Sequence, residues 1–273
     1  MSNSIKRVLS AIVLIGTVII CVNIGVKTAL CFLFLIGILI NDEIFCNFFK
    51  KRRYSVLYFS NQLILAVPFS MVIFLPVNEL LMSLLVKVAI LFNILLLVYL
   101  FYVDMKSNLL LNLGNKYPLV SSIYILINLM ALSSIFYLND WAKYLAILLF
   151  VAAGMDSGAW IFGKNFGKHK LWPSVSPNKT IEGLIGGALT AGFLGTIFWN
   201  VFFSNSSILL FSMLCLLGII SQLGDLVQSK IKRQFALKDS SNLIPGHGGV
   251  YDRLDSLFFL APFFAVAIKL FST

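Results

Sequence analysis

Apolar stretches long enough to cross a bilayer recur along the chain and constrain its fold more than any other feature. Each holds about twenty residues, the length that a helix needs to cross roughly 30 Å of hydrocarbon. The chain has 273 residues and is 59% hydrophobic, more than a soluble domain of this size requires. The stretches are continuous rather than alternating, which disfavours a transmembrane β-barrel. We predict an all-α polytopic membrane protein with about nine transmembrane helices, at residues 7–23, 25–41, 57–76, 79–103, 118–138, 141–163, 181–203, 206–228 and 254–272.

Basic residues are distributed unevenly between the predicted connections. If the N-terminus lies inside, the inside segments hold 17 of the 21 Lys and Arg residues, leaving Lys27, Lys87, Lys143 and Lys269. Cytoplasmic segments of membrane proteins are enriched in Lys and Arg. The pattern predicts an inside N-terminus and an outside C-terminus. It also explains the net charge of +10 through contact with the lipid bilayer, so no nucleic-acid partner is expected.

Polar chemistry is concentrated in the second half of the chain. Six of the eleven Asp and Glu residues lie after residue 150, on or near the predicted inside face. We therefore predict scaffold helices over residues 1–140 and a catalytic region over residues 141–273, with cytoplasmic loops at 164–180 and 229–253. The densest polar segment, residues 229–256, holds five cationic side chains, three carboxylates, a histidine and three glycines. Ionised groups beside a bilayer usually mark a functional site.

Two aspartates are expected at the start of the last span. Asp252 and Asp255 are three residues apart, which places both carboxylates on one face of the first helical turn. Helix capping would explain one of them alone, because the helix dipole favours negative charge there. Asp225 ends the preceding span on the same side, which makes a metal site the better explanation. We predict that Asp225, Asp252 and Asp255 are catalytic and bind one or two Mg²⁺ or Mn²⁺ ions.

A glycine-rich motif, Pro245-Gly246-His247-Gly248-Gly249, comes just before these aspartates. Glycine permits close approach of a ligand, and successive backbone N–H groups can bind an anion. Gly248 and Gly249 are predicted to contact substrate, and His247 to orient a phosphate or transfer a proton. A flexible connection between helices is the alternative.

Basic residues around this motif suit phosphate groups. Lys232, Arg233, Lys238 and Arg253 are predicted to neutralise a triphosphate and a lipid phosphate. Positive-inside charge is the simpler explanation for some of the basic residues here, which include Lys230.

A second polar motif, residues 176–183, leads into the seventh span. Ser176, Pro177, Lys179 and Thr180 lie where backbone N–H groups at a helix N-terminus can bind an anion. Thr180 is an equally good candidate for a helix N-cap. Small residues then recur every fourth position from Gly183 to Gly195, which predicts close helix packing within the chain or in a dimer.

Asp156 lies within the sixth span, roughly 10 Å below the interface if each residue rises 1.5 Å. A carboxylate at that depth is costly, so we predict that Asp156 faces a polar cavity and contacts substrate. Pairing with a lysine, metal ligation and an interhelical hydrogen bond remain open.

The segment SKIKRQFALKDSSNLIPGHGGVYDRLD from Ser229 to Asp255 resembles the signature of the CDP-diacylglycerol synthases, or phosphatidate cytidylyltransferases. The segment from Asp156 to Gly183 and the motif Gln222-Leu223-Gly224-Asp225 also resemble this family. Gln228 stands where a glutamate is common, and Ser157, Asn178 and Ile181 also differ from the commonest residues. No departure removes a predicted ligand or cation.

The resemblance implies transfer of CMP from CTP to phosphatidic acid, giving CDP-diacylglycerol and pyrophosphate. It also implies a divalent metal, a homodimer of mostly helical subunits, and metal-binding and catalytic roles for Asp225, Asp252 and Asp255. Such an enzyme is expected in a bacterial inner membrane with its site facing the cytoplasm.

Three alternatives remain at this level. A CTP-dependent lipid kinase would transfer the γ-phosphate and release CDP. A transporter would bind ions through buried acids near the midplane, whereas the acids here gather at one face. A non-catalytic membrane scaffold would retain its function when Asp252 is replaced by Asn.

Overall fold

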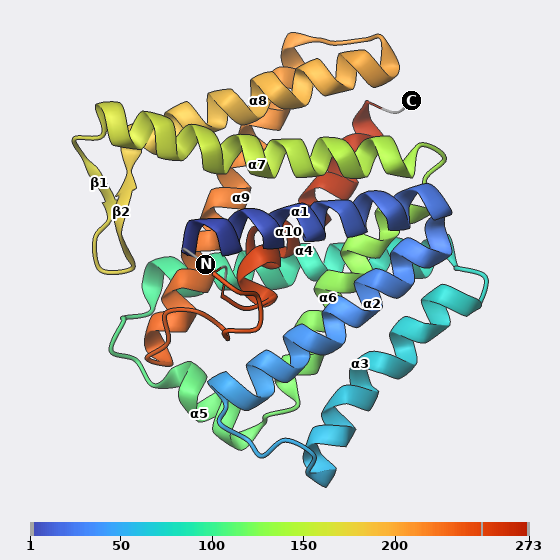
Figure 1. Ribbon diagram of the computed structural model, residues 1–273, viewed down its shortest axis with the longest axis vertical. Helices are drawn as coiled ribbons and strands as arrows, with labels where there is room; N and C mark the ends of the chain where they lie inside the picture. Colours follow the sequence, from blue (N-terminus) through green and yellow to red (C-terminus); the bar gives the residue numbers. More distant parts are fainter. Residues whose placement is uncertain (1–2, 247, 272–273) are drawn as a thin grey trace.

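Helices dominate the computed structural model, which describes residues 3–246 and 248–271 (Figure 1). The first half contains α1 (Asn3–Ile24), α2 (Val26–Glu43), a π-helical turn η1 (Ile44–Phe48), α3 (Val56–Phe74), α4 (Glu79–Tyr102), α5 (Leu109–Lys116), α6 (Val120–Ser133) and the short helix η2 (Ser134–Tyr137). The second half contains α7 (Trp141–Phe166), the strands β1 (Lys170–Trp172) and β2 (Ser176–Thr180), α8 (Ile181–Phe203), α9 (Ile208–Gln234), α10 (Tyr251–Ala267) and η3 (Ile268–Leu270).

Within the described part of the chain, seven helical segments are long and apolar enough to cross a membrane. They are α2 with η1, α3, α4, α6 with η2, α7, α8 and α9. The structure thus confirms an all-α polytopic membrane protein. The first predicted span corresponds to the shorter apolar helix Val8–Ile24 within α1. The last corresponds to α10, which has 17 residues.

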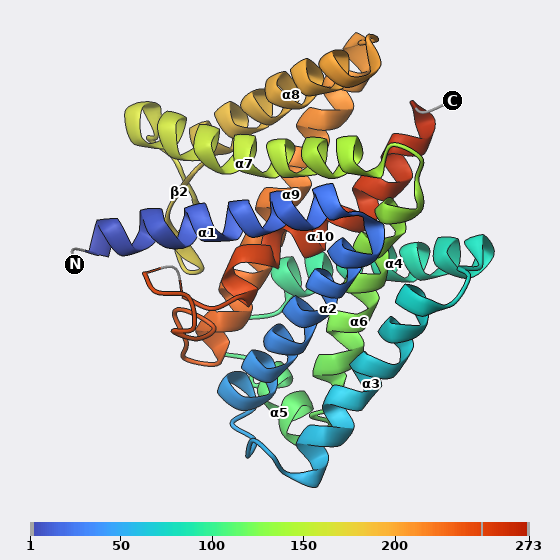
Figure 2. The same ribbon diagram turned by 45° about the vertical axis from the view of Figure 1, so that its right-hand side comes forward.

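The helix α10 packs against helices from both halves of the chain. It contacts α9, α6, α4 and α7, and Figure 2 shows it passing between them. Most of its apolar side chains are buried, including Phe258, Phe259, Leu260 and Phe264. Because α10 is enclosed in this way, Asp252 in its first turn and Asp255 just after that turn have fixed positions relative to the surrounding helices.

The helices α7 and α8 form the most extensive helix pair and lie side by side in Figures 1 and 2. A Cβ atom added at Gly183 would lie 2.8 Å from the carbonyl oxygen of Ala159, and one at Gly187 would lie 2.7 Å from that of Met155. The small-residue ridge predicted on this span therefore packs within the chain, against α7.

The predicted cytoplasmic loops contain more regular structure than expected. Residues 170–180 form an antiparallel hairpin that pairs Lys170 with Thr180 and Trp172 with Ser176. The helix α9 continues to Gln234, so residues 229–234 of the predicted 229–253 loop are helical. In both views the hairpin and the α9–α10 connection lie at the same end of the molecule. This arrangement brings the two predicted polar motifs together.

Candidate active site

The hairpin delivers a lysine to an aspartate of α9. Lys179 Nζ on β2 donates to Asp225 Oδ2 at 2.5 Å, and Ser229 Oγ, one turn further along α9, lies 3.3 Å from Asp225 Oδ1. Thr180 ends the strand and caps α8, because its Oγ1 accepts from the N–H of Gly183 at 3.1 Å. The cap fixes the point where β2 meets α8, and so the position of Lys179.

Asp252 lies in the first turn of α10 and is held by the preceding loop. Its Oδ2 accepts from the N–H of Ser240 at 2.8 Å, the N–H of Gly249 at 2.9 Å and Ser240 Oγ at 3.0 Å. Its Oδ1 accepts from Lys232 Nζ at 2.9 Å. Four donors therefore fix the orientation of this carboxylate.

Lys232 connects the two aspartates of α10. Its Nζ lies 3.7 Å from Asp255 Oδ2 in addition to its bond with Asp252. The N–H of Ser256 donates to the other Asp255 oxygen at 2.8 Å. Lys232 and Asp255 are each 8% exposed, so these charges interact with little screening by solvent.

The predicted acidic residues line one open cavity of about 260 Å³. Its walls are formed by Asp156, Asp225, Lys232, Asp239, Asp252, Arg253, Asp255 and Ser256. Five carboxylates thus face two cationic side chains. We refer to this cavity as the acidic chamber.

Two further cavities adjoin the acidic chamber and share residues with it. One, of about 290 Å³, shares Asp156 and Asp225 and extends between α7, α8 and the hairpin, where Ser176, Lys179 and Thr180 line it. The other, of about 460 Å³, shares Asp239 and Arg253 and is lined by Lys238 and Gly248 in the α9–α10 loop. Asp156 therefore faces a polar cavity, as predicted from its depth in the span.

The glycines of the loop allow close packing around Asp252. Gly248 has a φ of +82°, and a Cβ atom there would lie 2.7 Å from Asp252 Oδ2. A Cβ atom at Gly249 would lie 1.9 Å from Ser240 Oγ. Both positions therefore require glycine, at least in part because protein groups approach them closely.

Four of the predicted site residues lie apart from these cavities or cannot be placed. Gly249 lines none of the three cavities, although its N–H bonds Asp252. Arg233 is exposed, and its guanidinium donates to the carbonyl of Leu237 at 3.1 Å. Pro177 is exposed on β2 and does not line the chamber or its neighbours. His247 lies outside the described residues.

Lys230 is buried away from the site, although its neighbours Lys232 and Arg233 look similar in sequence. Its Nζ donates to the carbonyl oxygens of Tyr99 at 3.0 Å and Leu100 at 2.8 Å, and also to that of Val103. An ammonium group at these last carbonyls stabilises the C-terminus of α4. Lys230 thus fastens α9 to the first half of the chain.

The acidic chamber has the donors that a divalent cation requires. Its excess of carboxylates would repel a polyphosphate, and a divalent cation would reverse that repulsion. Among the described residues, no three acidic, histidine or cysteine side chains converge closely enough to enclose an ion by themselves. Magnesium is usually bound by one or two carboxylates and completes its shell with water and substrate phosphates, so the residues present fit it.

One acid that supports the site comes from the first half of the chain and was not predicted. Glu43, the last residue of α2, accepts hydrogen bonds from the α9–α10 loop and is 2% exposed. Glu43 is followed by four uncharged residues, 44–47, and does not belong to a recognisable motif. The only signal in the sequence is its position at the inner end of a predicted span.

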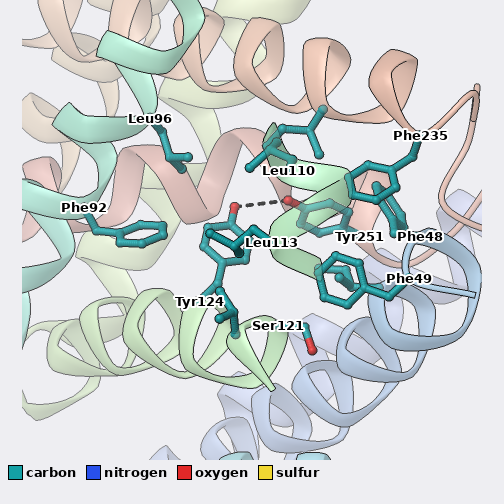
Figure 3. Close-up of a pocket in the computed structure, with 13 residues that line it drawn as sticks. Phe48, Phe49, Phe92, Leu96, Leu110, Leu113, Ser121, Tyr124, Phe235 and Tyr251 are labelled. Carbon is teal, nitrogen blue, oxygen red and sulfur yellow. Dashed lines mark hydrogen bonds between the residues drawn. The ribbon is translucent and has the colours of Figure 1, made fainter. Parts of the chain in front are cut away.

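An apolar cavity of about 100 Å³ borders Tyr251, the residue before Asp252 (Figure 3). Its walls carry aromatic side chains from both halves of the chain, among them Phe48, Phe92 and Phe235. The hydroxyls of Tyr124 and Tyr251 lie 3.1 Å apart, and the Gln228 amide bonds both of them. Gln228, which replaces the glutamate common at this position, therefore has a neutral hydrogen-bonding role.

Comparisons with known proteins identify the family of the chain. A model of the cytidylyltransferase family matches residues 5–271. The chain is 49% identical over 118 residues to the phosphatidate cytidylyltransferase of Bacillus subtilis (strain 168), a match that covers 43% of this chain and 44% of that protein. It is 46% identical over 125 residues to the enzyme of the same name from Staphylococcus haemolyticus (strain JCSC1435), covering 45% and 48%. These matches thus span slightly less than half the length of each relative. Because the family model covers nearly the whole sequence, the chain belongs to the cytidylyltransferase family.

Proposed function

We propose that the chain is a CTP:phosphatidate cytidylyltransferase, which transfers CMP from CTP to phosphatidic acid and releases pyrophosphate. Membership of the cytidylyltransferase family and relatives named phosphatidate cytidylyltransferase support this reaction. The observation that carries it is the acidic chamber, in which Asp225, Asp252 and Asp255 meet beside Lys232 and Arg253. Carboxylates and cations in one chamber suit the handling of several phosphate groups together.

In the proposed reaction, a lipid phosphate oxygen attacks the α-phosphorus of CTP and the bond to the β-phosphate oxygen breaks. Lys179, Lys232 and Arg253 hold the phosphates and offset their charge, and Lys238 and Gly248 bind substrate in the adjoining cavity. Asp156, Ser176 and Thr180 bind substrate on the hairpin side. The nucleophile is already an anion, so the residues need to orient it rather than remove a proton.

Asp225, Asp252 and Asp255 are the residues that would hold Mg²⁺ or Mn²⁺, as one or two ions. A bound ion supplies charge stabilisation for the phosphate oxygens during transfer. The four donors around Asp252 orient its carboxylate before substrate arrives. Second-shell groups of this kind commonly set the position of a metal-binding carboxylate.

Less supports a role in the reaction for Arg233, His247 and Pro177 than for the residues that line the cavities. The Arg233 bond to Leu237 supports the shape of the loop that carries Lys238. A substrate role for His247 rests on the sequence motif alone. Gly249 contributes through its N–H bond to Asp252.

The topology in this proposal has nine membrane crossings, with the N-terminus inside and the C-terminus outside. The distribution of basic residues supports it, and α1 and α10 supply the crossings beyond the seven long helices. The chamber then faces the cytoplasm of a bacterial inner membrane, where CTP is available. Residues 1–140 form the scaffold and residues 141–273 the catalytic region. The proposed homodimer rests on the family resemblance.

The experiment uses purified protein in detergent with phosphatidic acid, Mg²⁺ and CTP labelled in parallel at the α- or the γ-phosphorus. The α-label should move into lipid with an equal amount of pyrophosphate released. Transfer of the γ-label to lipid, with release of CDP, would replace this proposal with a lipid kinase. No transfer of either label by folded protein would contradict both reactions.

A further inference from the structure

Glu43 is a buried carboxylate from the scaffold half whose partners all belong to the α9–α10 loop and the start of α10. Its Oε1 accepts from Ser241 Oγ at 2.6 Å and the N–H of Val250 at 2.8 Å. Its Oε2 accepts from Ser240 Oγ at 2.9 Å and the N–H of Tyr251 at 2.9 Å. Within the described residues Glu43 forms no ion pair. Four neutral donors therefore compensate a charge whose burial would otherwise be costly.

The bonds of Glu43 continue directly to Asp252. Ser240 Oγ lies within hydrogen-bond distance of both Glu43 Oε2 and Asp252 Oδ2, and its one hydroxyl hydrogen is shared between these two acceptors. The Ser240 N–H donates to the same Asp252 oxygen. Gly249 lies against the same group, since a Cβ atom there would be 2.7 Å from both Glu43 oxygens. The Gly249 N–H also donates to Asp252. Every loop donor to Asp252 thus comes from a residue in contact with Glu43.

The π-helical turn after Glu43 adds two further contacts on the same side. Asn47, four residues later, donates from Nδ2 to the carbonyl of Ser240 at 2.7 Å. Phe48 packs edge-on against Tyr251, with ring centroids 6.1 Å apart, and the two labelled side chains lie together in Figure 3. This end of the scaffold therefore grips the loop at Ser240 and at Tyr251. Single π-helical turns of this kind often occur at functional sites.

We propose that Glu43 is a positioning residue for the reaction, which fixes Asp252 and the start of α10 through Ser240 and the backbone of Val250 and Tyr251. The inference rests on the proposed function, because Asp252 is placed there in the reacting centre. It assigns the scaffold an indirect part in catalysis, since α2 would set the orientation of a carboxylate that contacts substrate or metal.

The first test is Glu43→Gln, which keeps the size of the side chain. Its amide nitrogen cannot accept, so the N–H of Val250 or Tyr251 would face another donor. We expect kcat to fall roughly 10–100-fold, as when other second-shell partners are lost, with little change in either KM. Amide exchange in residues 240–251 should become faster than in wild type, which reports the loop without using activity.

Two variants show whether the effect passes through Ser240 and remains specific. Ser240→Ala should also lower kcat. The double variant with Glu43→Gln should lose less kcat than the two single losses combined, because both replacements remove the same hydrogen-bonded connection to Asp252. Asp42→Asn is the matched control, since Asp42 bonds Arg53 and Tyr58 and forms no hydrogen bond with the described residues of the loop. It should leave kcat and loop exchange unchanged.

A wild-type kcat and wild-type loop exchange in Glu43→Gln would overturn the inference, and so would independent, additive losses in the double variant. If Glu43→Gln does not fold, Ser241→Ala decides, because it removes one of the four donors and should give a smaller fall in kcat with faster loop exchange. Failure of the proposed function looks different. Wild-type protein would then transfer no CMP to lipid, while loop exchange would still respond to Glu43→Gln.

Discussion

Carboxylates in the two halves of the molecule have different surroundings. Glu43, at the end of α2, has both oxygens filled by donors from hydroxyl and backbone groups, and it borders none of the three polar cavities. Asp225 and Asp255, in the second half, contact lysines and also line the acidic chamber. An acid that borders no polar cavity has a structural part, whereas an acid that lines a cavity can meet a ligand, even where the protein also bonds it, as at Asp252.

The buried lysines show the same contrast. Lys230 donates to three backbone carbonyls at the end of α4 and is 2% exposed. Lys232, two residues later, faces Asp252 and Asp255 in the chamber. Residues two apart on a helix point in different directions, so one segment of α9 serves both packing and chemistry.

Metal removal should cause the largest loss of activity and leave the packing of the helices intact. EDTA is expected to abolish CMP transfer, and added Mg²⁺ to restore it, because the chamber has an excess of carboxylates toward phosphate. Circular dichroism should show the helices unchanged, because no cluster of metal-binding side chains holds the helices together in the described part of the chain. Full activity after exhaustive chelation would contradict the metal part of the proposal.

Lys179→Met should come next, with kcat/KM lower by about 100-fold, because it removes a cation beside the transferred phosphates. The methionine preserves most of the volume, so the unfolding midpoint should change little. Lys143→Met is a suitable control, since Lys143 on α7 pairs with Asp140, lies over the Phe203 ring and lines none of the three polar cavities. Equal effects of the two replacements on kcat/KM would argue against a specific role for Lys179.

Lys230→Met should have the opposite effect to Lys179→Met: it should lower the stability of the protein and leave the rate of the reaction unchanged. Loss of its bonds to the end of α4 should lower the free energy of unfolding by about 1.5–3 kcal/mol, measured by unfolding in mixed micelles. The kcat per folded molecule should stay close to that of wild type. A large loss of kcat without destabilisation would place Lys230 in the reaction instead.

Tyr124→Phe should have the smallest effect. It removes the hydroxyl that bonds Gln228 and Tyr251 beside the apolar cavity, at an expected cost of about 1 kcal/mol in unfolding free energy. Transfer should remain near the wild-type rate because Asp252 keeps all of its donors. A fall in kcat above tenfold would show that the tyrosine pair also controls the site.

Local sequence patterns were sufficient to predict much of this structure. Apolar length located the long helices, and the positions of Asp252 and Asp255 predicted the start of α10, where Asp252 lies in the first turn and Asp255 just after it. An N-cap at Thr180 was one of two interpretations of its position before an apolar run, and the bond that its Oγ1 accepts from Gly183 supports that interpretation. In each case the deciding interaction lies within a few residues along the chain, so one sequence contains the information.

Long-range contacts could not be predicted in the same way. Glu43 and Ser240 are 197 residues apart, and nothing in either segment indicates the other. Lys230 and Lys232 have the same chemistry, and only the packing of α9 against α4 separates their roles. The hairpin at 170–180 was predicted as a loop because its strands are short and rich in polar and proline residues.

The most direct test of the account compares wild type with Asp252→Asn in one assay of α-labelled CTP with phosphatidic acid and Mg²⁺. Asparagine keeps the shape of the side chain but removes its charge. Its amide nitrogen cannot accept a hydrogen bond, so either the loop donors or Lys232 would lose their acceptor. We expect CMP transfer to fall by at least about 100-fold while the protein remains helical and retains its unfolding transition. Transfer at the wild-type rate by folded Asp252→Asn would contradict the assignment of the acidic chamber as the active site.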